Sequence, residues 1–426
     1  MPPNLSEQNP PLTPHEAFVE SNRCLFCYDA PCTHACPTHI DIPRFIKKIA
    51  TANLTGSART ILDSNLMGAT CARVCPVEEL CEGACVLNSG HNPIMIGRLQ
   101  RHAMDYVSSR RIDVIKSAPP TGRKIAVIGA GPAGLSCAGE LARRGHDVTV
   151  FEKRALGGGL STYGIIVLRE PVAVALEEVE MIARLGVKFA TGTECAPSQI
   201  ADYDAVFVGT GLGASPALGI PGEEDFITDG LAFIEQSKMD LPNLRVGDNV
   251  VVIGAGNTAI DCATVAKRCG ATRVTMVYRR TEKEMTAYPH EYEFVKNEGV
   301  EFAFLTQPIA ALSSGLECIR MELGPPDASG RPAPVPIPGS KFLIEADQII
   351  KAIGQQKTSI ASQFGLDTGR GYIKVDAGFE TSRKGVYAGG DCIRAKGSAS
   401  TVMAVQDGKL AAAAIHNMLA SEAAHG

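Results

Sequence analysis

The pattern of hydrophobic and polar positions changes along the chain and divides it into regions. Between residues 15 and 110, apolar positions recur at helical spacing, as in IPRFIKKIATANL and GRLQRHAMDYVSS, which predicts short helices. Residues 124–153 and 249–280 each show an apolar run, a glycine-rich turn, an apolar helical stretch and a second apolar run. Continuous β-branched runs of this kind are typical of parallel strands buried on both faces. The pattern therefore predicts a helical N-terminal region and two α/β nucleotide-binding units.

The segments that connect these regions are rich in proline and glycine. Residues 111–123 lose the helical periodicity and contain Pro-Pro, which predicts a linker. Residues 324–340, GPPDASGRPAPVPIPGS, contain six prolines, and we expect a surface loop there. Residues 385–419 predict a strand, a glycine turn, a loop and a long alanine-rich helix.

Composition and charge exclude several classes of protein. A chain of 426 residues is too long for one core, so we expect two or three domains. The net charge of −5 gives no reason to expect binding to nucleic acid or to an acidic membrane surface. No apolar run approaches the roughly 20 residues that span a bilayer, and MPPNLSEQNPPLTP lacks the basic flank and apolar core of a secretory signal. We therefore expect a cytoplasmic protein that binds small molecules and neither nucleic acid nor membrane.

The first glycine turn has the context that a dinucleotide site requires, because it follows a strand, opens a helix and precedes a second strand. Gly129 allows the tight turn, Gly131 lets the backbone approach a pyrophosphate, and Gly134 permits close packing of helix and strand. Glu152 ends the next strand, 23 residues after Gly129, where its carboxylate accepts hydrogen bonds from an unphosphorylated ribose. A glycine turn in a domain without nucleotide is the alternative.

The second glycine turn differs from the first at two positions. Ala259 replaces the third glycine, and Arg279 and Arg280 stand where the strand-end carboxylate would be. A guanidinium at this position can bind a 2′-phosphate through charge and hydrogen bonds, so we expect a nicotinamide site that favours NADPH. A solvated basic turn in an NADH enzyme is the alternative. The expected cofactor contacts of the two turns are Gly129, Gly131, Pro132, Ala133, Gly134, Gly254, Gly256, Asn257, Thr258 and Ala259.

One chain with both sites indicates FAD together with NAD(P)H, because flavin is the usual device that splits a hydride pair into single electrons. The C-terminal AGGD sequence supports flavin, since Asp391 follows a predicted strand and is expected to face the ribityl chain. A flavin of this kind needs a one-electron acceptor. The cysteines near the N-terminus are candidates for binding it.

Eight of the 14 cysteines lie between Cys24 and Cys85, and disulfides are rare in the cytoplasm. The first group has the spacing C-x2-C-x4-C-x3-C-P, close to the bacterial ferredoxin run, whose fourth cysteine binds a different cluster from the first three. By this logic Cys24, Cys27 and Cys32 bind one iron–sulfur cluster and Cys36 a second. The second group, CARVCPVEELCEGAC, again contains Cys-Pro. A pair of structural zinc sites is the alternative, although zinc leaves the flavin without an electron outlet.

The predicted fold is α/β, with an N-terminal α-helical iron–sulfur domain followed by two Rossmann-like dinucleotide-binding domains, the second inserted in the first. We expect two 4Fe-4S clusters in residues 1–110 and a linker at 111–123. The FAD-binding domain is expected at 124–222 and 355–426, and the NAD(P)H-binding domain at 223–354.

Nine motifs together are specific: CLFCYDAPCTHACP, GATCARVCPVEELCEGAC, IGRLQRH, IAVIGAGPAGLSCA, VFEK, GGLSTYGI, VVVIGAGNTAIDCA, VYRR and YAGGD. Over nearly its whole length the sequence resembles the electron-input half of dihydropyrimidine dehydrogenase, which in bacteria is a separate subunit of the PreT type. It is similar, more distantly, to the small subunit of bacterial glutamate synthase. Both belong to a family of FAD and iron–sulfur oxidoreductases.

The resemblance implies ligand sets for both clusters. One cluster is expected on Cys24, Cys27, Cys32 and Cys85. The other is expected on Cys36, Cys75, Cys81 and Gln100. Cys71 is then a bystander, although the sequence leaves open whether Cys71 or Gln100 is the eighth ligand.

The resemblance also implies contacts to the other cofactors. Around FAD it places Glu152, Lys153, Leu160, Arg169, Asp391 and Thr401. It places Arg279 and Arg280 near the 2′-phosphate of the nicotinamide cofactor. The sequence departs from the family at Ile166, where a proline is usual and which alters the packing over the flavin. Thr286 replaces a basic residue of the phosphate site, so the NADPH preference is weakened and NADH is possible.

The function implied is that of an NAD(P)-dependent oxidoreductase, a diaphorase subunit of dihydropyrimidine dehydrogenase. Electrons are expected to pass from NAD(P)H through FAD and two 4Fe-4S clusters to a partner of the PreA type. That FMN- and iron–sulfur-containing catalytic subunit reduces uracil or thymine to 5,6-dihydropyrimidines, so we expect a hetero-oligomer. No catalytic acid–base residue is expected in this chain.

Two alternatives remain. One is the small subunit of glutamate synthase, which supplies electrons to a large amidotransferase subunit. The other is a non-catalytic assembly module whose cysteines bind zinc and whose glycine turns hold structural nucleotide. Visible absorption distinguishes the assembly module from the dihydropyrimidine dehydrogenase and glutamate synthase subunits, because flavin and iron–sulfur clusters are coloured and zinc is not.

Overall fold

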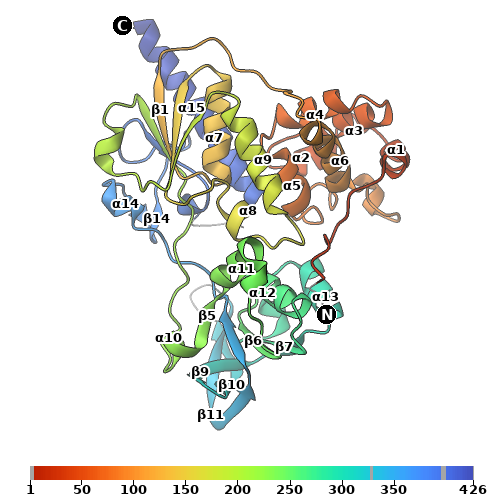
Figure 1. Cartoon of the computed structure of the whole chain (residues 1–426), viewed down its shortest axis with the longest axis vertical. Coiled ribbons are helices and arrows are strands. Elements are labelled where there is room, and N and C mark those ends of the chain that lie inside the picture. Colours follow the sequence, from red (N-terminus) through yellow and green to blue (C-terminus); the bar gives the residue numbers. More distant parts are fainter. Residues whose placement is uncertain (1–3, 327–329, 395–399, 426) are drawn as a thin grey trace. The chain divides into compact units, whose positions relative to one another are not determined.

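The computed structural model describes residues 4–326, 330–394 and 400–425. The chain forms two compact units, whose elements are labelled in Figure 1. The larger unit contains Gln8–Thr162, Arg169–Leu212 and Lys357–Gly426. The smaller unit contains Met1–Glu7, Tyr163–Leu168 and Gly213–Gln356. The middle of the chain is thus a unit of its own, inserted between segments of the larger one.

The N-terminal part of the larger unit is helical. Its helices are α1 (Pro14–Asn22), α2 (Pro31–Ala35), α3 (Ile42–Ala50), α4 (Leu54–Leu62), α5 (Gly68–Val74) and α6 (Ile96–Ser109). A reciprocal cap begins α1, in which the Glu16 amide donates to Thr13 Oγ1 and the Thr13 amide donates to the Glu16 carboxylate. Phe45, Ile46 and Leu99 are fully buried in one core. The cysteine-bearing segments therefore rest on packed helices.

The first sheet completes the larger unit. Its five parallel strands are ordered β15 (Val386–Ala388), β4 (Ala205–Val208), β1 (Lys124–Ile128), β2 (Asp147–Glu152) and β3 (Lys188–Thr191). The longer helices are α7 (Pro132–Arg143), α9 (Val172–Ala183) and α15 (Thr401–His425), and the short elements are α8 (Leu160–Tyr163), α14 (Ile360–Gln363), β13 (Thr368–Gly369) and β14 (Tyr372–Ile373).

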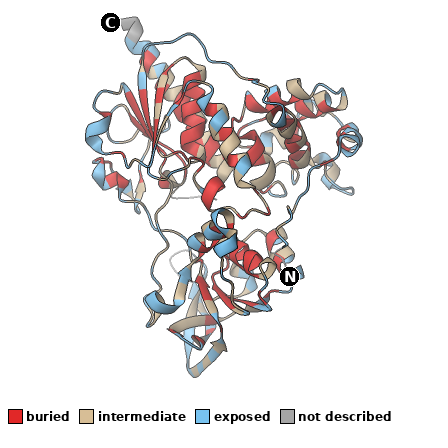
Figure 2. Ribbon diagram, in the orientation of Figure 1, coloured by how far each residue is buried: buried red, intermediate tan, exposed pale blue. Residues whose placement is uncertain are grey.

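Two of these helices approach each other closely at a glycine. Figure 2 shows that α7 is buried along most of its length. Helix α15 lies along it so closely that a Cβ on Gly408 would be 2.1 Å from the Ala133 carbonyl oxygen. This contact ties the C-terminal helix to the first glycine turn, since α7 begins one residue before Ala133.

The smaller unit contains the second five-stranded parallel sheet. Its strands are ordered β5 (Ile227–Asp229), β12 (Gln348–Lys351), β6 (Asn249–Ile253), β7 (Arg273–Val277) and β8 (Glu301–Ala303). Its helices are α10 (Glu223–Phe226), α11 (Gly230–Met239), α12 (Asn257–Arg268) and α13 (Pro289–Asn297). The second glycine turn joins β6 to α12 as the first joins β1 to α7. The predicted fold class, a helical domain followed by two Rossmann-like units, is confirmed.

The expectation of a surface loop at 324–340 is wrong for most of the described part of this range, and residues 327–329 lie outside the described residues. Strands β9 (Thr306–Leu312), β10 (Gly315–Pro326) and β11 (Pro332–Glu345) form an antiparallel sheet in which β11 is an edge strand. The prolines of β11 alternate along it: Pro332, Pro334, Pro336 and Pro338. On an edge strand every second amide points away from the neighbouring strand, so proline there removes no sheet hydrogen bond. Proline content alone therefore misled the prediction.

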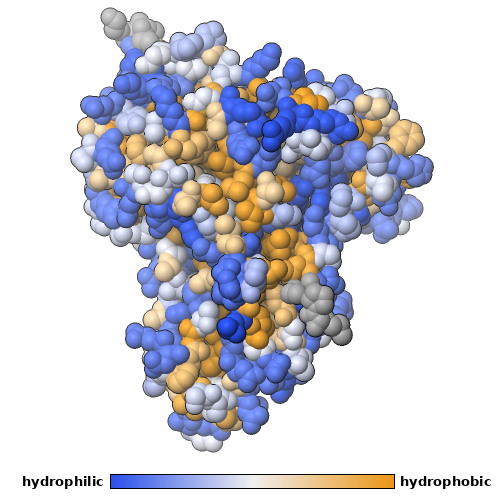
Figure 3. Space-filling view, viewed as in Figure 1, coloured by the Kyte–Doolittle hydropathy of each residue, from blue (hydrophilic) through white to orange (hydrophobic). Residues whose placement is uncertain are grey.

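The surface is mixed in polarity. Hydrophilic and hydrophobic residues are interspersed on the face drawn in Figure 3. None of the described helices combines the length and apolarity that crossing a lipid bilayer requires. Most single exposed apolar residues need no explanation. Leu25 and Tyr28 stand out, because they are 60% and 107% exposed and adjoin the first cysteines.

Candidate iron–sulfur and dinucleotide sites

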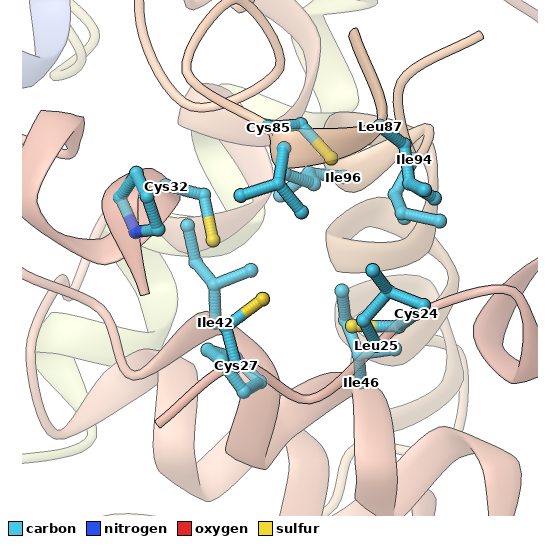
Figure 4. Close-up of a pocket in the computed structure, with 13 residues that line it drawn as sticks. Cys24, Leu25, Cys27, Cys32, Ile42, Ile46, Cys85, Leu87, Ile94 and Ile96 are labelled. Atoms are coloured by element: carbon cyan, nitrogen blue, oxygen red, sulfur yellow. The ribbon is translucent and has the colours of Figure 1, made fainter. Parts of the chain in front are cut away.

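The first expected ligand set lies around a single cavity in the helical region. Figure 4 shows four thiols that surround the same space, those of Cys24, Cys27, Cys32 and Cys85. Branched aliphatic side chains also line it, namely Ile42, Ile46, Leu87, Ile94 and Ile96. The cavity measures about 20 Å³, more than the roughly 10–15 Å³ that one water needs. Its lining consists of cysteines and apolar residues alone.

The chemistry of this donor set fits an iron–sulfur cluster. Burial, reinforced by the nearby thiols of Cys24 and Cys85, raises the pKa of Cys32 to about 11. Because the apolar lining supplies no countercharge, thiolates here need a positively charged inorganic centre. Among the described residues, no three His, Cys, Asp or Glu side chains converge closely enough to hold one metal ion. Thiols spread around a cavity favour a cluster, which binds a sulfur at each corner, over a zinc ion.

The second expected ligand set lies around another cavity of about 20 Å³. Its lining includes Cys36, Cys75, Cys81 and Gln100. A glutamine on a helix is usually exposed, yet Gln100 on α6 is only 7% exposed. Its amide nitrogen donates to the Gly68 carbonyl at 2.7 Å, which leaves the amide oxygen as the donor atom for a metal.

Cys71 lies in the same cavity, a position that the resemblance did not imply for a bystander. It is 2% exposed, and its thiol helps to raise the pKa of the neighbouring Cys75. The cavity therefore offers Cys71 and Gln100 beside three other cysteines, and the choice of the eighth ligand stays a prediction.

Substitution separates the two candidates. We expect Cys71→Ala to keep the iron of both clusters, because Gln100 completes the second set. We expect Gln100→Cys to keep the iron as well but to change the reduction potential, since a thiolate donates more charge than an amide oxygen. Iron and sulfide analysis with an EPR-monitored redox titration measures both. Loss of one cluster in Cys71→Ala, and of none in Gln100→Ala, would make Cys71 the ligand.

The first glycine turn is shaped by two close backbone approaches. Gly129 has a φ of +99°, and a Cβ there would lie 2.6 Å from the Gly209 carbonyl oxygen. A Cβ on Gly134 would lie 1.9 Å from the Gly129 carbonyl oxygen. Gly131 differs, because its φ of −78° suits any residue and the nearest atoms to its Cβ position are 4.0 Å away. The protein itself does not require glycine at 131, so the open space before α7 fits a pyrophosphate.

Other expected flavin contacts gather around this turn. Glu152 Oε2 accepts a hydrogen bond from the Ala130 amide at 2.8 Å. The AGGD turn lies beside Ala133, whose Cβ would be 3.0 Å from a Cβ on Gly390, and burial raises the pKa of the adjacent Asp391. The remaining expected contacts lie elsewhere in the larger unit: Lys153 and Leu160 are exposed, Arg169 and Thr401 are half-buried, and Pro132 begins α7.

The second glycine turn repeats this construction in the smaller unit. Gly254 has a φ of +138°, and a Cβ there would lie 2.3 Å from the Ala352 carbonyl oxygen. Gly256, with a φ of −100°, again suits any residue, and its Cβ position is 3.2 Å from Thr286 Oγ1. Thr286 therefore lies beside the turn, where the resemblance places a basic residue. The other expected contacts begin α12: Asn257, Thr258 and Ala259.

The two expected phosphate-binding arginines differ in their surroundings. Arg280 is 4% exposed, and its Nε donates to the Pro332 carbonyl at 3.1 Å. Arg279 is exposed. The sequence does not separate them, because the contact that buries Arg280 comes from β11, a strand that the proline pattern does not predict. Arg279 is therefore the residue to test for contact with a 2′-phosphate.

We expect Arg279→Ala to raise the KM for NADPH by about 5–10-fold and to leave the KM for NADH unchanged, because one charge-assisted contact to the phosphate is lost. Steady-state kinetics with ferricyanide as acceptor measures both values. Arg273→Ala is the control, since Arg273 is exposed and pairs with Glu301. An equal rise for both cofactors would contradict a phosphate contact.

Comparison with known proteins places these sites in a family. Residues 3–112 match the family described as dihydropyrimidine dehydrogenase domain II, 4Fe-4S cluster, and residues 123–408 match pyridine nucleotide-disulphide oxidoreductase. The glutamate synthase [NADPH] small chain of Halomonas elongata is 34% identical, over 96% of this chain and 92% of its own. The NAD-dependent dihydropyrimidine dehydrogenase subunit PreT of Escherichia coli O157:H7 is 33% identical over 97% of both. The chain belongs to the glutamate synthase small-subunit-like family of iron–sulfur flavoproteins.

Members of this family differ in length. The NADP(+)-dependent formate dehydrogenase subunit beta of Moorella thermoacetica is 37% identical, but this chain spans only 60% of it. Among solved structures, thioredoxin reductase of T. acidophilum has a TM-score of 0.56 at 22% identity, over 70% of this chain and 99% of its own, which shows the shared fold of the dinucleotide-binding units. As a family member, this chain is an NAD(P)-dependent oxidoreductase that carries 4Fe-4S clusters and FAD and transfers electrons.

One lining residue escaped the sequence reasoning. Val402, in the first turn of α15, lines the second cysteine cavity. More than 300 residues separate it from the other lining residues of that cavity, so no local pattern reveals the contact. It brings the C-terminal helix α15 to the second cysteine cavity.

Proposed function

We propose that this chain is the electron-input subunit of a dihydropyrimidine dehydrogenase. It oxidises NAD(P)H and passes electrons through FAD and two 4Fe-4S clusters to an FMN-containing partner of the PreA type, which reduces uracil or thymine. Val402 in the lining of the second cavity is the observation that carries the electron path, and the match of residues 3–112 to dihydropyrimidine dehydrogenase domain II favours this branch of the family. Val402 connects the flavin-binding segment to a cluster site, so the cofactors form one path.

The position of each cavity gives the path a direction. The second cavity is lined by α15, whose first residue, Thr401, is an expected flavin contact. The first cavity includes Leu25, which is 60% exposed. We therefore assign the second cavity to the cluster nearer the flavin and the first to the cluster from which electrons leave. The exposed residues at the first cavity then lie where a partner subunit docks.

The side chains of this chain bind and orient rather than react. Bound flavin supplies the conversion of a hydride into single electrons. Gly131 and Gly256 leave room for two pyrophosphates, and Glu152 holds the edge of the first turn. Aliphatic side chains give the first cavity a lining of low polarity, which limits the reorganisation that accompanies electron transfer. No side chain has to move a proton in this relay, so we name no catalytic residue.

We also propose the domain limits that this path requires. Residues 1–110 carry the clusters, residues 124–222 and 355–426 bind FAD, and residues 223–354 bind NAD(P)H. The longest segment of the smaller unit, Gly213–Gln356, lies close to the last of these ranges, whereas Tyr163–Leu168 of the same unit falls within the proposed FAD range.

A second candidate is the small subunit of a glutamate synthase. The observation that favours it is the 34% identity with the Halomonas elongata small chain, against 33% with PreT. Both relatives are named as parts of larger enzymes, which supports a hetero-oligomer in either case. The two candidates share the diaphorase mechanism and differ in the partner.

A tagged chain isolated anaerobically from its native cells tests the choice. We expect NADPH or NADH oxidation that depends on uracil or thymine, together with co-purification of an FMN-containing subunit. Oxidation that depends instead on glutamine and 2-oxoglutarate would replace the proposal by glutamate synthase. A colourless preparation without iron or flavin would contradict both.

A further inference from the structure

Helix α15 brings a positive charge to two segments that border the second cysteine cavity. Val402 lines that cavity, and Lys409 follows it by seven residues, which places both on the same face of the helix. Lys409 Nζ donates to the Thr38 carbonyl at 3.0 Å and to the Ser64 carbonyl at 2.9 Å. A lysine from the flavin-binding part of the unit thus holds two segments of the helical part.

Both segments border the cavity. Cys36 and Pro37 precede Thr38, and Asn65 follows Ser64, and these three residues line the cavity. Cys36 Sγ also lies 3.4 Å from Thr38 Oγ1. Lys409 therefore donates to the backbone of Thr38, whose side chain contacts the expected ligand Cys36. Among the described residues, Lys409 forms no ion pair with a carboxylate at contact distance, and Glu140 is the nearby carboxylate that acts on its charge.

We infer that the Lys409 ammonium raises the reduction potential of the 4Fe-4S cluster bound in the second cavity. Reduction adds one electron and one negative charge to the cavity, and a fixed positive charge nearby stabilises the reduced form without any proton being taken up. With an effective dielectric constant of about 20, a unit charge roughly 10 Å from a redox centre changes its equilibrium by on the order of tenfold. Lys409 is a positioning residue that makes this cluster a better acceptor for electrons from the flavin.

Burial lowers the pKa of Lys409, whereas the nearby Glu140 and Cys36 act to raise it. Lys48 offers a matched comparison in the same unit, because burial lowers its pKa too, and its Nζ donates to Gly56 and Thr60. Lys48 lines neither cavity.

The test is an EPR-monitored redox titration of the holoprotein with the variants Lys409→Met, Lys409→Arg and Lys48→Met. At a fixed potential we expect Lys409→Met to lower the ratio of reduced to oxidised second cluster by about tenfold, equal to about 59 mV for one electron. Lys409→Arg, which keeps the charge, and Lys48→Met, which removes the charge of a lysine bound to Gly56 and Thr60, are expected to stay near the wild-type value. An unchanged potential in Lys409→Met, or an equal shift in Lys409→Arg, would overturn the inference.

Two further measurements keep the test decisive. If Lys409→Met loses iron, Lys409→Gln is used, because its amide still donates to a carbonyl while the charge is gone; the same shift is expected, and no shift rejects the inference. The inference rests on the proposed ligands of the second cavity. Iron analysis of Cys36→Ala tests that assignment separately, since it reports loss of a cluster and not a change in potential.

Discussion

Replacing Gly131 by valine is expected to give a folded protein without flavin. The backbone at Gly131 suits any residue, and its Cβ position is 4.0 Å from the nearest atoms of the protein. The Cβ of a valine therefore meets no obstacle in the protein, and the side chain is expected to fill the space before α7 that a pyrophosphate would occupy. We expect FAD affinity to fall on the order of 100-fold or more, while the thermal unfolding midpoint of the apoprotein stays within a few degrees. Flavin fluorescence and circular dichroism measure these two quantities.

The matched variant is Gly256→Val in the second turn. Its backbone is equally permissive, and the nearest atom to its Cβ position, Thr286 Oγ1, is 3.2 Å away. We expect this protein to keep its flavin and to lose NAD(P)H-dependent ferricyanide reduction through a large rise in KM. Reduction of the same protein by dithionite should be unaffected. Loss of flavin from Gly256→Val and not from Gly131→Val would reverse the assignment of the two turns.

Replacing Glu178 by glutamine is expected to stabilise the larger unit at alkaline pH. Glu178 on α9 accepts hydrogen bonds from the Ala69 amide at 2.6 Å and the Thr70 amide at 3.2 Å, and it is 3% exposed. Burial and the neighbouring carboxylate of Glu170 raise the pKa of Glu178 to about 8. Since this is above the unfolded value of 4.5, the folded chain holds the proton more tightly. Stability is therefore lost as the pH rises from about 5 to about 8.

Glutamine keeps an acceptor oxygen for these amides and carries no charge at any pH. Between pH 5 and pH 8 we expect the wild type to lose roughly 2–4 kcal/mol that Glu178→Gln retains. Unfolding midpoints followed by circular dichroism across this range measure the difference. Glu180→Gln is the control, because Glu180 lies on the same helix with 66% of its side chain exposed. Parallel pH profiles for wild type and Glu178→Gln would contradict a raised pKa.

Much of the architecture was accessible from the sequence because its signals are local. Strand, glycine turn and helix recur within about 30 residues, so both Rossmann-like units could be predicted from pattern alone. The edge strand β11 was missed, since edge pairing removes the usual penalty for proline and leaves the segment looking like a loop.

The candidate sites, like the fold, could be predicted from the sequence only in part. Both cysteine sets that the resemblance implied gather in separate cavities, and Gln100 is buried beside one of them. The presence of Cys71 in that cavity and the burial of Arg280 were not foreseen. Val402 and Lys409 were also missed, because their contacts join residues hundreds of positions apart and leave no periodic signal. Such contacts are set by tertiary packing alone.

The lining of the two cavities also fixes when each is completed during synthesis. The last residue that lines the first cavity is Ile96, whereas the second waits for Val402. At ribosomal rates of roughly 5–20 residues per second, about 15–60 s separate these two events. In a nascent chain, all residues that line the first cavity are therefore available to the iron-delivery machinery long before α15 completes the second cavity. We expect the cluster in the first cavity to be inserted before the cluster in the second cavity. This order is opposite to the proposed direction of electron flow.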